Sequence, residues 1–457
     1  MSGPSKTVLV NLTVASVQLN PRIGRLEETI SRVKSLLDKF KLELSRDKRK
    51  KVTPDLVVLP EFALTGYNFH SKSSILPYAF PTTESPTFKL AQFVSRDLNC
   101  YTVIGYPEHD LKTDTFYNSA MVVSPRGDLV FNYRKHFLYD TDEEWSCEEN
   151  PRGFQTFDLT FSKCGRLVRQ EDDNSGTNET TPEPIDVTLR ASIGICMDLN
   201  PYKFTAPFND YEFATYCLDN DVELMICPMA WLHSSSVTAR DRENEPDDSV
   251  VTSTPSSSSL NTIDAKLKNI SDSLKMEGVP EYGSQGLFQI DIDNSRVTAR
   301  ISSEEVDTMT MANSSNGVST PGYRHLDEPD MSNVNYWILR FFPFVHFSER
   351  ARWYANYNID KLLGGRKSYL GVSRDKPWHF AGRQAVLVVA NRCGVEDGDT
   401  VFAGSSGVYL FNGRSAGEQL SDSMSVDSTN PSVDLLGNLG KGHEGIIMRD
   451  VQFNVYR

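Results

Sequence analysis

Short runs of Val, Ile and Leu alternate along the chain with segments whose apolar residues recur at helical spacing. The helical spacing predicts helices over residues 26–40, 88–98 and 210–218. The apolar runs predict strands over residues 8–18, 55–59, 101–106, 189–196, 223–227 and 387–390, and hairpins over 120–133 and 401–411. Strands interleaved with helices are typical of an α/β fold.

Four polar stretches interrupt this pattern. They contain few large apolar residues and cover residues 165–187, 234–261, 296–323 and 414–434. Each is longer than the roughly 12–15 residues beyond which loops in compact domains become uncommon. We interpret them as disordered or loop-like surface insertions in a single domain of residues 1–457. They carry 18 acidic and 7 basic residues, so most of the formal net charge of -14 lies within them.

Composition narrows the classes of function. A net charge of -14 argues against binding to the phosphate backbone of nucleic acid or to an anionic membrane surface. There is no apolar run long enough for a transmembrane helix, and the N-terminal residues lack the apolar core of a secretory signal. The seven cysteines have no Cys-x-x-Cys spacing, which argues against a zinc site and a disulfide framework. We expect a cytoplasmic protein, with the nucleus also open, that uses no metal or cofactor.

Three residues that could carry chemistry each come at the end of a predicted strand. Glu61 follows the apolar run 55–59, Lys135 ends the first hairpin, and Cys196 ends the strand 189–196. A cysteine nucleophile needs a base and an oxyanion stabiliser, which a half-buried Glu and a desolvated Lys can supply. Because strand ends of an α/β sheet gather ligands, the three together indicate a catalytic site.

Each of these residues also has a simpler explanation. Glu61 could cap a turn, and Lys135 could belong to a solvated basic tip at the end of its hairpin. Cys196 could be a small buried hydrophobic residue, which is a common role for cysteine.

The motifs around these residues resemble the nitrilase, or carbon–nitrogen hydrolase, superfamily. They occur in the order expected of that family, and they are Pro60-Glu61, Gly66-Tyr67, Tyr117-Asn118-Ser119-Ala120, Tyr133-Arg134-Lys135, Gly194-Ile195-Cys196-Met197-Asp198, Cys227-Pro228-Met229-Ala230-Trp231, Ala390-Asn391-Arg392 and Phe402-Ala403-Gly404-Ser405-Ser406-Gly407. The resemblance implies an α-β-β-α sandwich, here with long polar insertions and a C-terminal extension. Within the superfamily, residues 60–69, 131–150, 192–208, 227–232 and 327–343 are most similar to the fungal N-terminal amidases.

This resemblance implies hydrolysis of the side-chain amide of an N-terminal Asn or Gln. The reaction releases ammonia and leaves Asp or Glu, which enters the N-degron route of protein degradation. By the same resemblance, Cys196 is the nucleophile, Glu61 the general base and Lys135 the oxyanion stabiliser. The expected partners are peptides or proteins with a free N-terminal Asn or Gln, and both a monomer and a homodimer are open.

A second catalytic carboxylate is expected shortly after the lysine, because many relatives carry one there. Asp142, Glu143 and Glu144 compete for this role, and the spacing from Lys135 favours Glu143. The simpler interpretation of this cluster is a solvated acidic loop.

Four further residues are candidates for substrate binding. Asn200 stands where relatives often carry an Arg, so Asp198 lacks its usual partner. We therefore hypothesise that Asp198, or an acid of the cluster such as Asp142, pairs with the α-ammonium of the substrate. The alternative is that Asp198 binds backbone amides. Tyr67 and Trp231 are predicted pocket walls, although aromatic residues at these places could equally be core.

Two other functions stay open. An enzyme that hydrolyses an ω-amide or a carbamoyl (ureido) amino acid would share the three catalytic residues and differ only in its pocket. A non-catalytic binding subunit could keep the fold, but the presence of all three residues argues against it.

Overall fold

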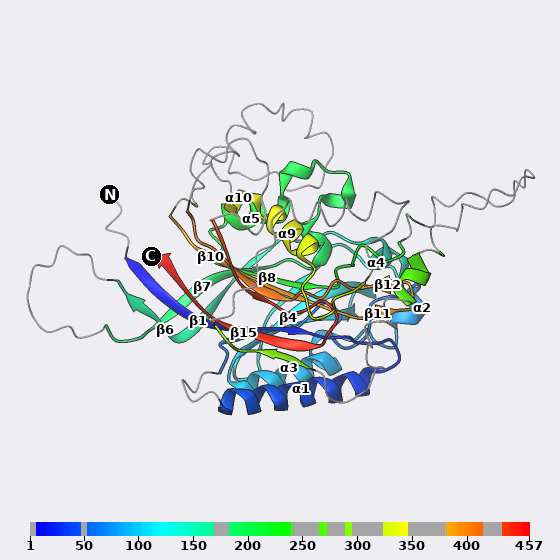
Figure 1. Cartoon of the computed structure of the whole chain (residues 1–457), viewed down its shortest axis with the longest axis horizontal. Helices are drawn as coiled ribbons and strands as arrows, with labels where there is room; N and C mark the ends of the chain where they lie inside the picture. The colour runs from blue at the N-terminus through cyan, green and yellow to red at the C-terminus, as the bar shows by residue number, and fades with distance from the viewer. Residues whose placement is uncertain are drawn as a thin grey trace, which may run out of the picture.

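The computed structural model describes residues 6–46, 53–168, 182–238, 241, 264, 266–271, 288–294, 323–345, 380, 382–414 and 432–457. Its main strands form two layers (Figure 1). The first layer has the order β5 (Leu129–Arg134), β4 (Thr115–Val123), β3 (Tyr101–Asp110), β2 (Leu56–Val58), β1 (Thr7–Gln18), β15 (Gly445–Tyr456), β9 (Gln289–Asp291). The second has the order β6 (Thr156–Leu167), β7 (Ile185–Ile193), β8 (Leu224–Met229), β10 (Ala385–Asn391), β13 (Gly407–Phe411), β14 (Val433–Asn438). Hydrogen bonding continues between the layers where residues 8–10 of β1 pair with residues 165–167 of β6.

The alternation of side chains along β1 explains why both faces of the first layer are buried. Val10 and Val14 belong to the apolar cluster between the two layers, together with residues of β7, β8 and β10. Ala15 and Val17 point the other way and belong to the cluster beneath the helices. Because successive side chains of a strand face opposite sides, one apolar run supplies both cores.

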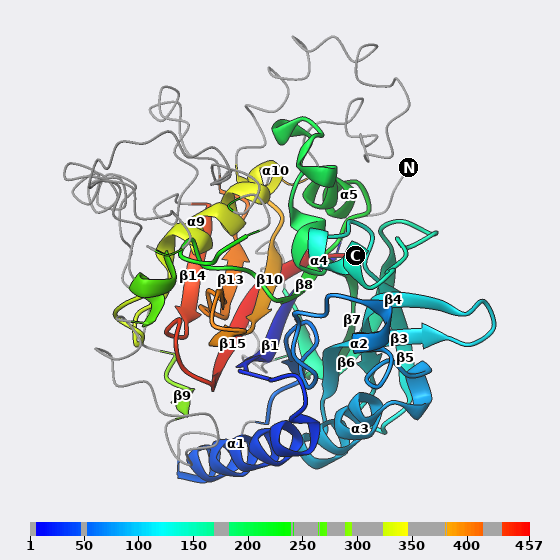
Figure 2. The same ribbon diagram turned by 90° about the vertical axis from the view of Figure 1, so that its right-hand side faces the viewer.

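Helices cover the outer face of each layer (Figure 2). The helices α1 (Leu26–Arg46) and α3 (Pro86–Leu98) pack on the first layer, and α5 (Glu212–Asp219), α9 (Met331–Arg340) and α10 (Phe342–Val345) pack on the second. The shorter helices α2 (Lys72–Ile75) and α4 (Asp140–Glu144) lie in connections. This arrangement confirms the predicted α/β class and α-β-β-α sandwich. No helix within the described ranges is long and apolar enough to cross a membrane.

The predicted second hairpin, over residues 401–411, is wrong. Val401 lies in β12 (Thr400–Val401), which pairs with β11 (Val395–Glu396), whereas β13 pairs with β10 and β14. The chain between them does not turn back on itself, because its backbone bonds elsewhere. The N–H of Ala403 donates to the carbonyl of Trp231 at 2.9 Å, and that of Gly404 donates to the carbonyl of Arg392 at 3.1 Å.

The predicted C-terminal extension is built into the sandwich. β15 pairs antiparallel with the whole of β1, from Thr7 opposite Tyr456 to Gln18 opposite Gly445. Val451 and Phe453 of β15 are buried in the central cluster. This strand and β6 and β14 were not predicted. β6 ends and β14 begins within stretches that we interpret as polar insertions from their composition.

The four predicted insertions fall mostly outside the described residues, so their disorder stays a prediction, as does the single domain of residues 1–457. Their margins, however, belong to the fold. β6 extends to Leu167, and Val237, Tyr323 and Val433 are buried. The packed structure therefore reaches several residues further than the polar composition indicates.

Candidate active site

Glu61, Lys135 and Cys196 lie close together, as their positions after β2, β5 and β7 predict. The ammonium of Lys135 lies 2.8 Å from Oε1 of Glu61. The backbone N–H of Ala230, directly after β8, donates to Oε2 of Glu61 at 2.7 Å. Ala230 and Cys196 line the same cavity, and the charge of Glu61 acts on the thiol of Cys196. Four strand ends from two layers thus converge on one buried centre.

Glu61 is fixed by its backbone as well as by its carboxylate. The segment that carries it packs on β3, where the N–H of Gly105 donates to the carbonyl of Pro60 at 3.0 Å. A Cβ at position 105 would lie 2.6 Å from Cα of Glu61, so only glycine permits this approach. The side chain of Glu61 is fully buried.

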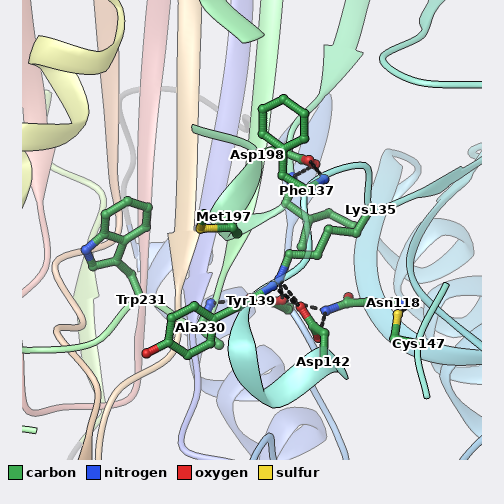
Figure 3. A network of polar contacts seen from close by, with 12 residues as sticks. Asn118, Lys135, Phe137, Tyr139, Asp142, Cys147, Met197, Asp198, Ala230 and Trp231 are labelled. Atoms are coloured by element: carbon green, nitrogen blue, oxygen red, sulfur yellow. Dashed lines mark hydrogen bonds and ion pairs between the residues drawn. The ribbon is translucent and has the colours of Figure 1, made fainter. Parts of the chain in front are cut away.

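Lys135 binds two carboxylates within a buried network (Figure 3). Besides Glu61, its ammonium contacts Oδ2 of Asp142 at 2.7 Å. The side-chain amide of Asn118 donates to Oε1 of Glu61 at 2.7 Å and to Oδ1 of Asp142 at 2.9 Å, so it bridges the two acids. These contacts use two of the three N–H bonds of the ammonium, which leaves the third to bind a substrate oxygen.

The charges in this network determine where protons reside. Burial raises the pKa of Glu61, and the positive charge of Lys135 opposes that rise. Burial alone would lower the pKa of Lys135, but the carboxylates of Asp142 and Glu61 outweigh it and hold that pKa well above its usual value. Lys135 is therefore a permanent cation here, while Glu61 is a carboxylate whose affinity for a proton exceeds that of an exposed acid.

Cys196 stands at a sharp turn. It follows the end of β7 and begins the short 3₁₀ helix Cys196–Leu199, and its φ of 44° lies in the left-handed region. A non-glycine residue with such a φ is strained, and this strain is typical of a nucleophile held out from a strand end. Burial and the negative charge of Glu61 raise the pKa of the thiol, so the resting sulfur carries its proton. A base must therefore remove that proton during attack.

Asp198 does not face a substrate. Its Oδ2 accepts hydrogen bonds from the hydroxyl of Tyr133 at 2.9 Å and from the N–H of Ile195 at 2.8 Å. Its Oδ1 accepts from the backbone N–H groups of His136 and Phe137 at 3.1 and 2.7 Å. The hypothesis that Asp198 pairs with the substrate amine is therefore wrong. This carboxylate ties the turn that carries Cys196 to the segment after Lys135.

Asp142, and not Glu143, occupies the position of the second carboxylate. Glu143 is exposed and pairs with Lys203 at 3.3 Å, so the spacing argument that favoured it was wrong. On α4, adjacent residues point in different directions, and the turn directs Asp142 inward. The N–H of Tyr139 also donates to Oδ2 of Asp142 at 3.0 Å. Because Asp142 is fully buried against Lys135, it is not placed to bind a substrate amine.

A matched pair of variants tests this assignment. Asp142→Asn is expected to reduce catalytic turnover by roughly 100-fold, because Lys135 loses a charged partner and shifts from its position. Glu143→Gln is expected to react close to the wild-type rate, because that side chain lies in solvent. Rates of ammonia release for both proteins check the prediction, and an equal loss in the two variants would contradict it.

A cavity of about 330 Å³ opens above Cys196. Its walls include the predicted residues Tyr67 and Trp231, together with Tyr139, Met197, Asn200, Phe204, Ala230, Leu232, Thr238, Asn333 and Tyr336. The indole N–H of Trp231 donates to Oδ1 of Asn333 at 3.0 Å, which fixes the ring as a wall. None of the described residues that line this cavity carries a charged side chain.

A second cavity of about 400 Å³ adjoins the first and shares Tyr67, Tyr139, Leu232 and Thr238 with it. Its walls carry three carboxylates, from Asp140, Glu144 and Asp399. The described lining contains no Lys or Arg, and His70 lies 2.6 Å from Glu144. The cavity that adjoins the one above Cys196 is therefore acidic.

Asn118 is a site residue that the sequence did not reveal as such. A signal was present, because Asn118 alternates along β4 with Ala120 and Val122, which face the central core. A polar residue on the buried side of an apolar strand requires polar partners. Within the described ranges, no group of three or more His, Cys, Asp or Glu side chains has a geometry that could hold a metal.

Comparison with known proteins agrees with this geometry. The family model for carbon–nitrogen hydrolases matches residues 13–196, which include Glu61, Lys135 and Cys196. The protein N-terminal amidase of Saccharomyces cerevisiae is 46% identical over 99% of this chain and 98% of its own length. The chain belongs to the protein N-terminal amidase family. The resemblance found in the sequence motifs is thereby confirmed.

Other N-terminal amidases support the same membership. The relative from Schizosaccharomyces pombe is 36% identical over 48% of this chain and 70% of its own length. A crystal structure of an N-terminal amidase with an Asn-Glu-Ala peptide superposes with a TM-score of 0.80, at 45% identity over 99% of this chain and all of that one. A second crystal structure, of an N-terminal amidase with a Gln-Val peptide, superposes with a TM-score of 0.80. Its chain is 44% identical, and the match covers 99% of this chain and all of the other.

Proposed function

We propose that this protein deamidates N-terminal Asn and Gln residues of peptides and proteins to Asp and Glu, with release of ammonia. The observation that carries the proposal is the site itself. A thiol, a buried carboxylate and a fixed cation converge beneath a cavity whose described walls are uncharged and which adjoins an acidic cavity. Relatives of the same family have been crystallised with peptides that begin with Asn or Gln.

In the first half of the reaction, the sulfur of Cys196 attacks the carboxamide carbon while Glu61 takes the thiol proton. The third N–H of Lys135 and a backbone N–H at the start of the 3₁₀ helix Cys196–Leu199 stabilise the negative oxygen of the tetrahedral intermediate. Glu61 then returns the proton to the nitrogen, the C–N bond breaks, and ammonia leaves. The product of this half is a thioester on Cys196.

In the second half, water replaces ammonia beside Glu61. The carboxylate takes a proton from the water, whose oxygen attacks the thioester carbon. The C–S bond then breaks, the sulfur regains its proton from Glu61, and the new carboxylic acid leaves. Glu61 and Cys196 return to their starting protonation states, so no further reactant is needed.

The charge distribution separates this function from its rival. A small ω-amide or carbamoyl amino acid carries a carboxylate that a site binds with Arg or Lys. The cavity above Cys196 has neither among its described walls, and Asn200 occupies the place where relatives often carry an Arg. The carboxylates of the adjoining cavity instead favour a cation, such as the free α-ammonium of a peptide. We further propose that the protein acts in the cytoplasm, where its products would enter the N-degron route.

A pair of peptides tests the proposed function. A peptide that begins with a free Asn is expected to lose ammonia, which mass spectrometry detects as conversion of the amide to the acid. The same peptide with an acetylated N-terminus is expected to react much more slowly, because it lacks the cation. The rate on the free peptide should also fall as salt is added, because ions screen attraction between exposed charges. Equal rates on the two peptides, or reaction on carbamoyl amino acids alone, would contradict the proposal.

A further inference from the structure

The hydroxyl of Tyr67 is buried without a hydrogen-bond partner among the described residues. Its side chain is only 2% exposed. The ring packs against Phe62 and Phe402 at centroid distances of 5.8 and 6.1 Å, and its backbone N–H donates to Glu396 at 2.9 Å. The hydroxyl is therefore held in place and cannot swing out to solvent.

Other buried tyrosines show that an unpaired hydroxyl is unusual in this protein. Other deeply buried tyrosine hydroxyls take part in hydrogen bonds with protein atoms, as in Tyr106, Tyr133, Tyr323 and Tyr409. An unpaired buried hydroxyl costs free energy, so a fold keeps one only where another need outweighs stability. The location of Tyr67 beside the reacting groups indicates that this need is catalysis or substrate binding.

Tyr67 lies beside the reacting groups. It lines both the cavity above Cys196 and the acidic cavity that adjoins it. Burial, together with the negative charges of Asp142 and Glu61, raises the pKa of its hydroxyl well above its usual value. The hydroxyl therefore stays protonated, and Tyr67 lines the same cavity as Cys196, whose sulfur would attack the carboxamide.

We propose that the Tyr67 hydroxyl binds the carboxamide of the substrate, by accepting a hydrogen bond from its NH₂ group. This inference rests on the proposed function and names a specificity residue for it. The amide oxygen is bound by the third N–H of Lys135, so the two N–H bonds of the amide require acceptors elsewhere. The oxygens of Glu61 already accept three hydrogen bonds, from Lys135, Asn118 and Ala230. This carboxylate therefore has room for at most one of the two amide N–H bonds, and the other needs a second acceptor.

The variant Tyr67→Phe removes only this hydroxyl. We expect kcat/KM on an Asn peptide to fall by about 10- to 100-fold, because a substrate N–H loses its buried acceptor. The Tm of the free enzyme is expected to stay the same or rise, because the hydroxyl forms no hydrogen bond with the part of the chain that the structure describes. In the Cys196→Ala background, which cannot turn over, Tyr67→Phe should weaken binding of the same peptide by about 10-fold.

Tyr133→Phe is the matched control. Its hydroxyl is equally buried but donates to Asp198 at 2.9 Å, so its removal is expected to lower Tm. If Tyr67→Phe lowers Tm as Tyr133→Phe does, the hydroxyl is structural and the inference is wrong. It is also wrong if Tyr67→Phe keeps the wild-type kcat/KM and binding. A wild-type enzyme that releases no ammonia would instead overturn the proposed function, so the two failures are distinguishable.

Discussion

Replacing Cys196 with alanine is expected to reduce ammonia release from an N-terminal Asn peptide by about 10⁴-fold or more. The variant lacks the sulfur that forms the thioester, and no neighbouring group can replace it as nucleophile. Cys196 lies at a turn beside the cavity and not in the middle of a strand, so its loss should leave the fold intact. Single-turnover assays that follow ammonia, together with a thermal melt, measure both effects.

Cys217→Ala is the control for this change. Cys217 is a fully buried cysteine of α5 that belongs to the central apolar cluster. Its truncation leaves a small cavity, so we expect a lower Tm and a retained reaction rate. The thioester should also be trapped by denaturing the wild-type enzyme during turnover, as a mass added to the peptide that contains Cys196. Substantial activity in Cys196→Ala would exclude the proposed mechanism.

Replacing Glu61 with glutamine is expected to cost about 10²- to 10⁴-fold in kcat, which is the usual contribution of a general acid–base residue. The amide has nearly the shape of the carboxylate, but it cannot take the proton of a thiol whose pKa is raised by burial. One of its ends also carries N–H donors that would face the N–H groups of Lys135, Asn118 or Ala230. Both half-reactions should slow, because Glu61 serves in each.

The pH dependence identifies the base more sharply than the rate alone. Burial raises the pKa of Glu61, and only the ionised carboxylate can accept the thiol proton. Wild-type activity should therefore be lost as pH falls through a value above that of an exposed glutamate. We call this fall in rate at low pH the acid limb of the pH–rate profile. The residual activity of Glu61→Gln should not show it.

Glu108→Gln provides the comparison for Glu61→Gln. Glu108 is another buried glutamate in a network. It lies on β3, next to β2, and pairs with Arg134 of β5 at 2.6 Å. Its replacement should lower Tm without changing the acid limb. If Glu61→Gln kept the wild-type pH profile, a different group would have to be the base.

Much of the fold could be predicted because the apolar pattern is local. β1 and β2 bury both faces, so their apolar runs are recognisable without their partners. β6 is not recognisable in this way. Its buried and exposed residues alternate irregularly, and its pairing with β7 shifts register between Phe161 and Gly165. β15 was missed for a related reason, since nothing near it in the sequence indicates that its partner is β1.

Some residues of the candidate site could likewise be predicted from local sequence, and others could not. Glu61, Lys135 and Cys196 were predictable because each follows a strand end, and strand ends of one sandwich converge. The choice between Asp142 and Glu143 was not predictable from spacing, because a one-residue difference on a short helix reverses burial and exposure. Asp198 likewise looked available in the sequence, while the fold surrounds it with four donors.

By itself, the sequence determined the α/β class, many of the strands and helices, the family, and the three residues at the reacting centre. These features depend on local periodicity and on residue types at strand ends, which the chain carries wherever it folds. Only the tertiary structure decided which carboxylate pairs with Lys135, that Asn118 bridges the acids, and that the Tyr67 hydroxyl is buried near Cys196 with no hydrogen-bond partner among the described residues. Those features depend on distances between residues far apart in the chain, and such distances are set only when the two layers pack.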